Sequence, residues 1–349
     1  MAELFKVSSP TRVDLAGGTG DLWPLYCLLP HSAKTINLAL TLAQQVTFEW
    51  IEAREFSMRV FSGAASAELK TPLERAQLPL VRPELQFPVF VLSEALREAT
   101  GIPKIALQVH LQSEVPVGSG LGGSSALCVA LTRGITRIIG GFSEQGWQWA
   151  MLPWVRDVEA RFLQTATGTQ DYLAALFGGL SCFISKLGGI ERSAYPEETA
   201  TAVAERMVVV FSGQMHQSGL SNWEIFKKAL EGDKEILKGL SAINDVAGSL
   251  DRELRLARHD WKAIGQLLNA EWRVRRELFR VNTPRLDELI GFLQQQSILG
   301  AKVCGAAAGG SILILCEPIQ RARLKESCEK KSVRILDCHT SSEGVSIRT

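Results

Sequence analysis

A glycine- and serine-rich run at residues 116–126 is the part of this sequence best suited to chemistry. It reads Pro116-Val-Gly-Ser-Gly-Leu-Gly-Gly-Ser-Ser-Ala126. Glycine N–H groups can converge on a phosphate because no Cβ blocks close approach or positive φ. A helix after the run would turn its unpaired N–H groups and its positive dipole end toward the same anion. The hydroxyls of Ser124 and Ser125 could hold a phosphate or its Mg²⁺, so the run predicts a phosphate-binding loop.

Three other interpretations of this run compete with that one. A Walker loop requires a lysine after its glycines, and none follows here. The dinucleotide fingerprint Gly-x-Gly-x-x-Gly fits Gly118, Gly120 and Gly123, with Glu144 about twenty residues further on. Residues 135–142, however, are too short and glycine-broken for the second strand that a dinucleotide fold needs. A plain turn between a strand and a helix stays open as the third interpretation.

The size and composition of the chain indicate a folded protein with one large or two ordinary domains. It has 349 residues, of which 46% are hydrophobic and 21% charged, which is enough for a core and unlike a disordered chain. The net charge of +1 gives no basic excess, so nucleic acid is not an expected partner. The five dispersed histidines show no metal-ligand spacing.

Cysteine usage and the first residues favour a cytoplasmic protein. The seven cysteines are odd in number, form no Cys-x-x-Cys pair and in several cases lie in apolar runs, so we expect reduced thiols. Arg12, Asp14 and Asp21 interrupt residues 1–30, so we expect no signal peptide. No run of about eighteen apolar residues is free of charges or polar breaks, so we expect no membrane partner.

Strands and helices are expected to alternate irregularly along the first half. β-branched and apolar residues predict strands at 4–8, 12–16, 36–50, 54–61, 105–112 and 180–184. Helical spacing of apolar residues predicts helices at 87–100, 124–139 and 152–163. The polar stretch 186–203, which contains two adjacent glycines and a proline, predicts a connection between domains.

The second half is predicted to hold a few strands and several helices. Strands are expected at 207–211, on both sides of a glycine turn within 301–315, and at 333–336. Helices are expected at 223–230, 234–249, 261–279, 284–296 and 321–330. Because strands and helices do not alternate strictly, the pattern favours an α+β fold over a doubly wound α/β fold.

Three separated blocks together resemble the GHMP kinases, a family named for galactokinase, homoserine kinase, mevalonate kinase and phosphomevalonate kinase. The first block is residues 9–21, Ser-Pro-Thr-Arg-Val-Asp-Leu-Ala-Gly-Gly-Thr-Gly-Asp, and the second is the loop at 116–126, which has one inserted-looking glycine, Gly123. The third is residues 300–310, where Ala306, Ala307 and Ala308 stand in positions that are often glycine. The three blocks occur in family order over nearly the whole chain.

Within the family, the sequence resembles the sugar-kinase branch and, most of all, the heptose 7-phosphate kinases. Residues 169–180, Thr-Gln-Asp-Tyr-Leu-Ala-Ala-Leu-Phe-Gly-Gly-Leu, are similar to a motif of those enzymes. The resemblance implies a two-lobed α+β GHMP kinase fold. Residues 1–185 would form a lobe like domain 2 of ribosomal protein S5, and residues 205–349 a ferredoxin-like lobe. It also implies ATP and Mg²⁺ as cofactors and a small-molecule sugar or sugar phosphate as substrate.

The resemblance assigns residues to the nucleotide and the metal. The ATP phosphates would lie on the loop residues Pro116, Gly118, Gly120, Leu121, Gly122, Gly123, Ser124, Ser125 and Ala126. Ser125 and Glu159 would hold Mg²⁺, which usually takes one or two protein carboxylates beside phosphate and water. Asp157 is the alternative carboxylate, and Glu159 could instead be a helix-surface acid that pairs with Arg156.

Two further sets of residues follow for catalysis and for the sugar. Asp171 would accept the proton of the attacking hydroxyl or orient that hydroxyl, and Arg12 would steady the transferred phosphoryl group or pair with Asp171. Asp21 would accept hydrogen bonds from sugar hydroxyls. The other predicted substrate residues are Gly18, Thr19, Trp23, Tyr26 and Arg275, with Ser218 and Trp272 as further candidates. An acid in the first turn of a helix, a strand arginine and a core tryptophan are the ordinary alternatives.

Two rival functions and several unknowns remain at this stage. A sensor that binds sugar and ATP without turnover would keep the same pocket, and the Ala306–Ala308 substitutions leave that alternative open. An NAD-linked oxidoreductase would follow from the dinucleotide interpretation. The sequence does not name the sugar, the hydroxyl or the anomer, and a homodimer stays open.

Overall fold

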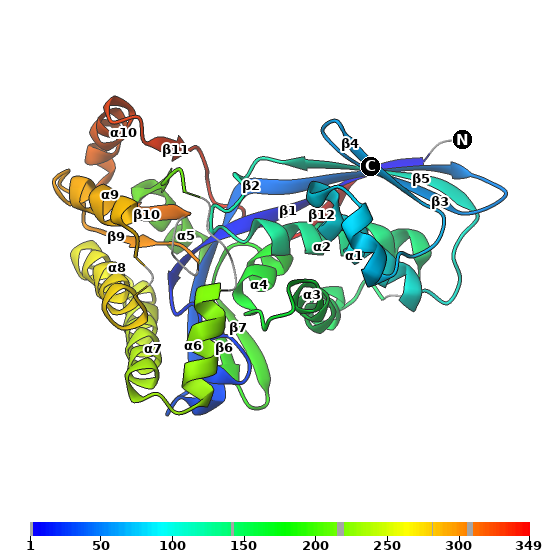
Figure 1. Ribbon diagram of the computed structural model, residues 1–349. Coiled ribbons are helices and arrows are strands. Elements are labelled where there is room, and N and C mark those ends of the chain that lie inside the picture. The colour runs from blue at the N-terminus through cyan, green and yellow to red at the C-terminus, as the bar shows by residue number, and fades with distance from the viewer. Residues whose placement is uncertain (1–2, 141–142, 215–219, 281, 306–309) are drawn as a thin grey trace.

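The computed structural model describes residues 3–140, 143–214, 220–280, 282–305 and 310–349, which form two lobes side by side (Figure 1). In the described residues the first lobe holds an eight-stranded sheet in the order β12-β1-β2-β5-β3-β4, with β6 paired to β2 and β7 to β6. Its strands are β1 (Glu3–Ala16), β2 (Ala33–Glu52), β3 (Ser57–Ser62), β4 (Ala65–Leu69), β5 (Ile105–Ser113), β6 (Leu180–Lys186), β7 (Gly189–Ala194) and β12 (Ser346–Arg348).

Four helices cover one face of this sheet (Figure 1). They are α1 (Pro83–Glu98), α2 (Gly123–Ile139), α3 (Trp147–Leu163) and α4 (Gln170–Phe177), and short 3₁₀ turns lie at Leu25–Leu28 and Arg75–Leu80. Apolar side chains from both layers, among them Phe48, Val109 and Leu131, make one buried cluster. This shared cluster therefore holds the end of β5 and the start of α2 in fixed positions.

The second lobe is a four-stranded antiparallel sheet in the order β11-β8-β10-β9, packed with helices. Its strands are β8 (Met207–Phe211), β9 (Gly300–Val303), β10 (Ser311–Leu315) and β11 (Arg334–Leu336). Its helices are α5 (Glu197–Arg206), α6 (Leu220–Leu230), α7 (Lys234–Leu254), α8 (Trp261–Val274), α9 (Pro284–Gln294) and α10 (Arg321–Lys330), with a π-helical turn at Arg275–Phe279 and a 3₁₀ turn at Pro318–Gln320.

The two lobes share a hydrophobic core. Leu38 of the first sheet, Leu250 of α7 and Leu313 of the second sheet belong to one buried cluster. Helix α7 contacts β1 and β2 as well as α8. A side chain at the end of β1 can therefore meet residues of α8 and β9 from the other lobe.

Several element predictions are corrected by the structure. β1 runs unbroken through Pro10, because a register shift between Pro10 and Thr11 accommodates the residue that lacks an N–H. The stretch 186–203 is not an irregular connection, since β7 and most of α5 lie within it. The strand β4 was not predicted, and α3 begins five residues before the predicted start at 152. The lobe boundaries at 185 and 205 stay a prediction, although β12, which falls within 205–349, pairs with the sheet of the first lobe.

The last described strand returns to the first lobe. β12 pairs antiparallel with β1, with Lys6 opposite Arg348. Just before it, the Val345 N–H donates to the Ala175 carbonyl of α4 at 2.7 Å. Gly344 packs so closely on α4 that a Cβ there would lie 2.1 Å from the Leu176 carbonyl oxygen. This segment therefore packs against the last turn of α4.

The state of the cysteines and the hydropathy of the helices bear on two of the sequence predictions. All seven cysteines are free, and all but the exposed Cys27 are buried. Burial raises the pKa of the Cys304 thiol to about 12, which keeps it protonated. Among the described residues, no helix has the length and apolar character needed to cross a bilayer.

Candidate active site

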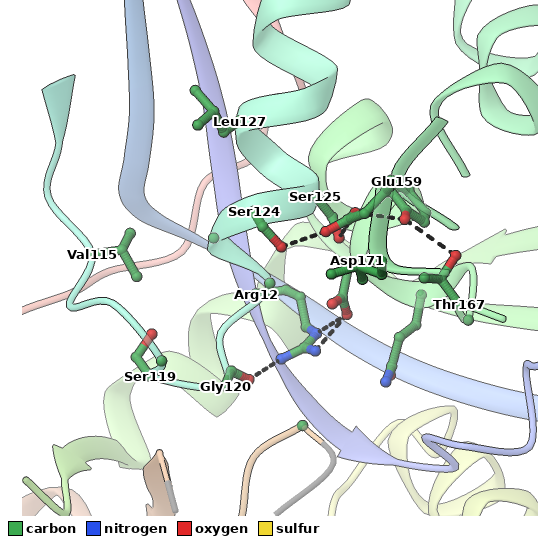
Figure 2. Close-up of a pocket in the computed structure, with 18 of the residues that line it drawn as sticks. Arg12, Val115, Ser119, Gly120, Ser124, Ser125, Leu127, Glu159, Thr167 and Asp171 are labelled. Carbon is green, nitrogen blue, oxygen red and sulfur yellow. Dashed lines mark hydrogen bonds and ion pairs between the residues drawn. The ribbon is translucent and has the colours of Figure 1, made fainter. Parts of the chain in front are cut away.

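A cleft of about 610 Å³ opens at the end of β5, where α2, α3 and α4 meet the turn after β1 (Figure 2). The first lobe supplies most of its lining, and the second lobe adds Asn222 and Gly305. The cleft contains the glycine-rich loop, Arg12, Asp21, Glu159 and Asp171, which lie far apart in sequence.

The glycine-rich loop has the backbone that the sequence predicted. Gly118, Gly120 and Gly122 have φ angles of 69°, 72° and 75°, which non-glycine residues rarely adopt. Gly122 directly precedes α2, so the first N–H groups of that helix lie beside the loop. A Cβ on Gly122 would lie 3.1 Å from Cβ and Cγ of Asp171, so the glycine also lets this carboxyl approach the loop.

Most of the predicted phosphate residues face the cleft. Those that line it are Pro116, Gly118, Gly120, Gly122, Gly123, Ser124 and Ser125. Leu121 and Ala126 are buried behind them, and the Leu121 carbonyl accepts a hydrogen bond from the Arg12 N–H at 3.0 Å. These two residues therefore support the loop from inside.

The third sequence block packs directly on this loop. The Ser311 N–H donates to the Ser119 carbonyl at 2.7 Å. A Cβ on Gly120 would lie 2.9 Å from the Cys304 carbonyl oxygen. The two glycine-rich blocks therefore meet across the lobe interface. The alanines at 306–308, singled out in the sequence, lie outside the described residues.

Glu159 of α3 accepts hydrogen bonds from both serines of the loop. Ser124 Oγ donates to Oε1 at 2.5 Å, and Ser125 Oγ donates to Oε2 at 2.7 Å (Figure 2). Tyr172 donates its hydroxyl to Oε2 at 2.6 Å. Burial raises the pKa of Glu159 despite these three donors, and the charge of Asp171 adds to the rise. Glu159 is thus an inward-facing carboxylate and not a surface acid.

The alternative carboxylate lies elsewhere. Asp157 is exposed, pairs with Arg156 at 2.7 Å and does not line the cleft; it borders a neighbouring groove. Among the described residues, no group of three or more His, Cys, Asp or Glu side chains is arranged to hold a metal ion.

Arg12 and Asp171 form an ion pair at the centre of the cleft. Arg12 Nε donates to Asp171 Oδ1 at 2.8 Å, Nη2 contacts the same oxygen, and Nη1 donates to the Gly120 carbonyl at 2.6 Å (Figure 2). Burial lowers the pKa of Arg12, but the charges of Asp171 and Asp14 outweigh this and raise it. The Asp171 side chain is 26% exposed, and its second oxygen, Oδ2, is not engaged by Arg12.

Two buried charges that the sequence analysis did not select lie behind this pair. Asp14 is 3.8 Å from Arg12 Nη1, contacts Lys302 Nζ, and accepts from the Gly305 N–H at 2.8 Å. Burial alone would raise the pKa of Asp14, yet Lys302, Arg12 and Arg275 lower it. Asp14 follows Arg12 by two in one strand, so strand alternation was a signal that the two share a face.

The turn after β1 supplies the other end of the cleft. Asp21 Oδ2 accepts from the N–H groups of Thr169 at 2.5 Å and Gln170 at 2.8 Å, at the start of α4. Burial raises the pKa of Asp21, the two amides oppose this, and the charge of Asp171 adds to it. Thr19 lines the cleft and lies 3.4 Å from Asn222 of α6. Neutral backbone amides therefore hold Asp21, whereas the guanidinium of Arg12 holds Asp171.

Some predicted substrate residues do not line the cleft. Trp23 is 63% exposed and Tyr26 is half-buried, and neither lines the cleft. Arg275 is buried behind the turn and its Nη2 donates to the Gly18 carbonyl at 2.8 Å. Ser218 lies outside the described residues.

The dinucleotide interpretation does not fit the structure. That fold needs a strand after the glycine-loop helix. Residues 135–139 belong instead to α2, and the next described element is α3.

Comparison with known proteins identifies both halves of the chain. The model of the GHMP kinases N terminal domain matches residues 89–179, and that of the GHMP kinases C terminal matches residues 253–333. The chain is 25% identical to D-glycero-alpha-D-manno-heptose 7-phosphate kinase of Campylobacter jejuni over 354 residues, which is 97% of each chain.

Other relatives extend this result. The chain is 27% identical over 347 residues to a bifunctional fucokinase/GDP-fucose pyrophosphorylase of Arabidopsis thaliana, covering 93% of this chain but only 31% of that protein. The fold matches galactokinase of Lactococcus lactis, solved with galactose, with a TM-score of 0.76, 14% identity and coverage of 99% and 95%. The predicted two-domain GHMP kinase fold is confirmed.

Proposed function

The chain carries both domains of the GHMP kinases, and from this premise we propose that it transfers the γ-phosphate of ATP to a hydroxyl of a sugar or sugar phosphate. The observation that carries the proposal is the position of Asp171, which lies against Gly122 of the glycine-rich loop and is held there by Arg12. The named activities of relatives on heptose 7-phosphate, fucose and galactose support a sugar as acceptor.

The glycine-rich loop would bind the triphosphate. Its backbone N–H groups and the start of α2 provide donors and a positive dipole end for the anion. Glu159, Ser124 and Ser125 bring one carboxylate and two hydroxyls together beside that loop. This all-oxygen set fits Mg²⁺, which keeps water and phosphate as its other ligands. When bound there, Mg²⁺ would neutralise phosphate charge during transfer.

Phosphoryl transfer would occur between this loop and Asp171. The oxygen of the sugar hydroxyl forms a bond to the γ-phosphorus, and the bond between that phosphorus and the β–γ bridging oxygen breaks, which releases ADP. Asp171 Oδ2 takes the hydroxyl proton or orients the hydroxyl, while Oδ1 stays bonded to Arg12. Arg12 offers a fixed positive charge to the transferred group. Asp21, Thr19 and Asn222 bind the other hydroxyls.

A panel of acceptors tests this function. Purified protein is incubated with ATP and Mg²⁺ and with heptose 7-phosphates, L-fucose, galactose, arabinose or uronic acids, and ADP release is measured. We expect release with at least one sugar, and ATP but not NAD should raise the melting temperature. Stabilisation by ATP without ADP release from any acceptor would favour the sensor alternative, and stabilisation by NAD would contradict the proposal.

A further inference from the structure

The turn at residues 17–19, which leads from β1 to Asp21, has a strained backbone. Thr19 has a φ of 77°, a conformation that threonine rarely adopts. Gly17 has a φ of 93°, and a Cβ there would lie 1.8 Å from the Lys34 carbonyl oxygen. Such strain persists only where surrounding groups hold it. Because Thr19 and Asp21 both line the cleft, the groups that hold this turn also place the acceptor residues.

Two buried side chains of the second lobe hold the turn. The Gly17 N–H donates to Glu271 Oε2 at 3.1 Å. Arg275 Nη2 donates to the Gly18 carbonyl at 2.8 Å, and Nη1 lies 3.4 Å from Thr19 Oγ1. Glu271 and Arg275 also bond each other at 3.0 Å, and their side chains are 0% and 1% exposed. Three consecutive residues of the turn are therefore fixed by one ion pair on α8 and its π-helical extension.

The same ion pair is connected to the catalytic carboxyl. Lys302 Nζ lies 3.3 Å from Glu271 Oε1 and also contacts Asp14, which faces Arg12. Arg12 in turn holds Asp171. Three cations and three anions thus alternate along one buried path from the turn to Asp171, and each charge is offset by a neighbour of opposite sign.

We propose that Glu271 and Arg275 are positioning residues of the acceptor subsite. They lie behind the turn without lining the cleft, and they hold Thr19 and Asp21 at a fixed distance from Asp171. This inference rests on the kinase function proposed above. Because the second lobe clamps the turn while the triphosphate loop sits on α2 of the first lobe, loosening the clamp should weaken acceptor binding more than ATP binding.

Arg275→Met tests the clamp, with Arg276→Met as its matched control. Arg276 is the next residue, is exposed and pairs with Glu277 at 3.3 Å. Kinetics are measured with whichever of L-fucose, D-galactose and D-glycero-D-manno-heptose 7-phosphate the wild-type protein phosphorylates fastest. We expect Arg275→Met to raise the KM for that acceptor about tenfold or more, since small misplacements of positioning groups have effects of that size. The KM for ATP should change less than about threefold, and Arg276→Met should change neither.

Amide hydrogen exchange supplies a second readout that needs no sugar. In Arg275→Met the peptide covering residues 15–22 should exchange faster, while the peptide covering 118–126 should keep its wild-type rate. Should Arg275→Met fail to fold, Arg275→Lys keeps the charge beside Glu271 and should show the same split on a smaller scale. Unchanged exchange at 15–22, or equal rises in both KM values, would overturn the clamp. If the wild-type protein phosphorylates no sugar, the kinase proposal fails while exchange still decides the clamp.

Discussion

The pairing of Arg12 with one oxygen of Asp171 divides the work of that carboxylate. Oδ1 is contacted by Nε and Nη2 of the guanidinium, whereas Oδ2 would lie 3.3 Å from a Cβ placed on Gly122. Under the proposed function, one oxygen fixes the side chain through Arg12 and the other meets the acceptor. An amide at this position would keep the shape but would lose the negative charge.

Replacing Asp171 by Asn should therefore remove turnover and leave nucleotide binding. Loss of a positioned base or orienting charge costs about 10²- to 10⁴-fold in rate. ADP release and the thermal shift caused by ATP measure the two effects. Asp157→Asn is the control, because Asp157 is exposed and does not line the cleft. A turnover for Asp171→Asn within a few-fold of the wild-type rate would refute the assignment.

The raised pKa of Glu159 predicts how the proposed Mg²⁺ requirement depends on pH. Burial holds the pKa above the ordinary value of 4.5, so the protonated form persists to higher pH than it would for an exposed glutamate. Only the carboxylate binds the metal. As pH falls through the raised pKa, the Mg²⁺ concentration for half-maximal ADP release should therefore rise.

Titrations of Mg²⁺ at neutral and at mildly acid pH measure this dependence. Glu159→Gln serves as the comparison, because it should need high Mg²⁺ at every pH. A wild-type requirement that stays constant while activity falls with acid would place the titrating group elsewhere.

The contact between the glycine-rich loop and α4 explains why position 122 has to lack a side chain. Two effects act on a larger residue there, the positive φ of 75° and the collision with Asp171. Gly146, which directly precedes α3 as Gly122 precedes α2, has a φ of 73° in the same left-handed conformation but nothing within 4 Å of its would-be Cβ. Alanine substitutions at these two glycines therefore separate the effect of backbone strain from the effect of displacing Asp171.

Gly122→Ala and Gly146→Ala should thus differ in activity more than in stability. Each should lose about 1–2 kcal/mol of unfolding free energy, because alanine disfavours the left-handed conformation. Only Gly122→Ala should reduce ADP release strongly, since the added methyl group displaces Asp171. Urea unfolding and steady-state kinetics on both variants measure these effects. Equal activity in the two variants would show that the loop and α4 are not coupled.

Much of the candidate site was predictable from local patterns in the sequence. The rest was not, because it depends on contacts between residues far apart in the chain. The loop at 116–126 was predictable because glycine spacing and the following helix are local signals, and Asp171 because it belongs to a short motif. Glu159 was assigned only through the resemblance to the family. The contact of Lys302 with Asp14 joins residues 288 apart, and no local pattern encodes such a distance. A lysine in an apolar strand is a local sign of a buried partner of opposite charge, but it does not identify that partner. The placement of Trp23 outside the cleft depends on how the turn folds back, which sequence does not show.

The segment before β12 makes the stability of α4 depend on a distant part of the chain. Gly344 lies against the carbonyl of Leu176, and Val345 bonds to Ala175. Because α4 carries Asp171, a disturbance at position 344 should reach the active site through the helix backbone. Gly291 offers a contrast, since it lies inside α9 with open space around it.

Gly344→Ala should accordingly destabilise the protein, whereas Gly291→Ala should stabilise it slightly. The first forces a methyl group to within 2.1 Å of a backbone oxygen, and overpacking of this kind costs about 1–3 kcal/mol. The second replaces a helical glycine, which is worth about 1 kcal/mol. Melting temperatures measure both, and ADP release should fall only for Gly344→Ala. A neutral effect of Gly344→Ala would mean that this segment does not brace α4.

The pairing of β12 with β1, in which Lys6 lies opposite Arg348, also affects the order in which the chain can fold during translation. A nascent chain that has emerged only as far as the second sheet would still lack β12 and the contacts of Gly344 and Val345 with α4. Domains usually fold as they leave the ribosome. The first lobe, however, could complete its sheet only after the strands of the second lobe had been synthesised. Catalytic competence would then arrive in a single late step.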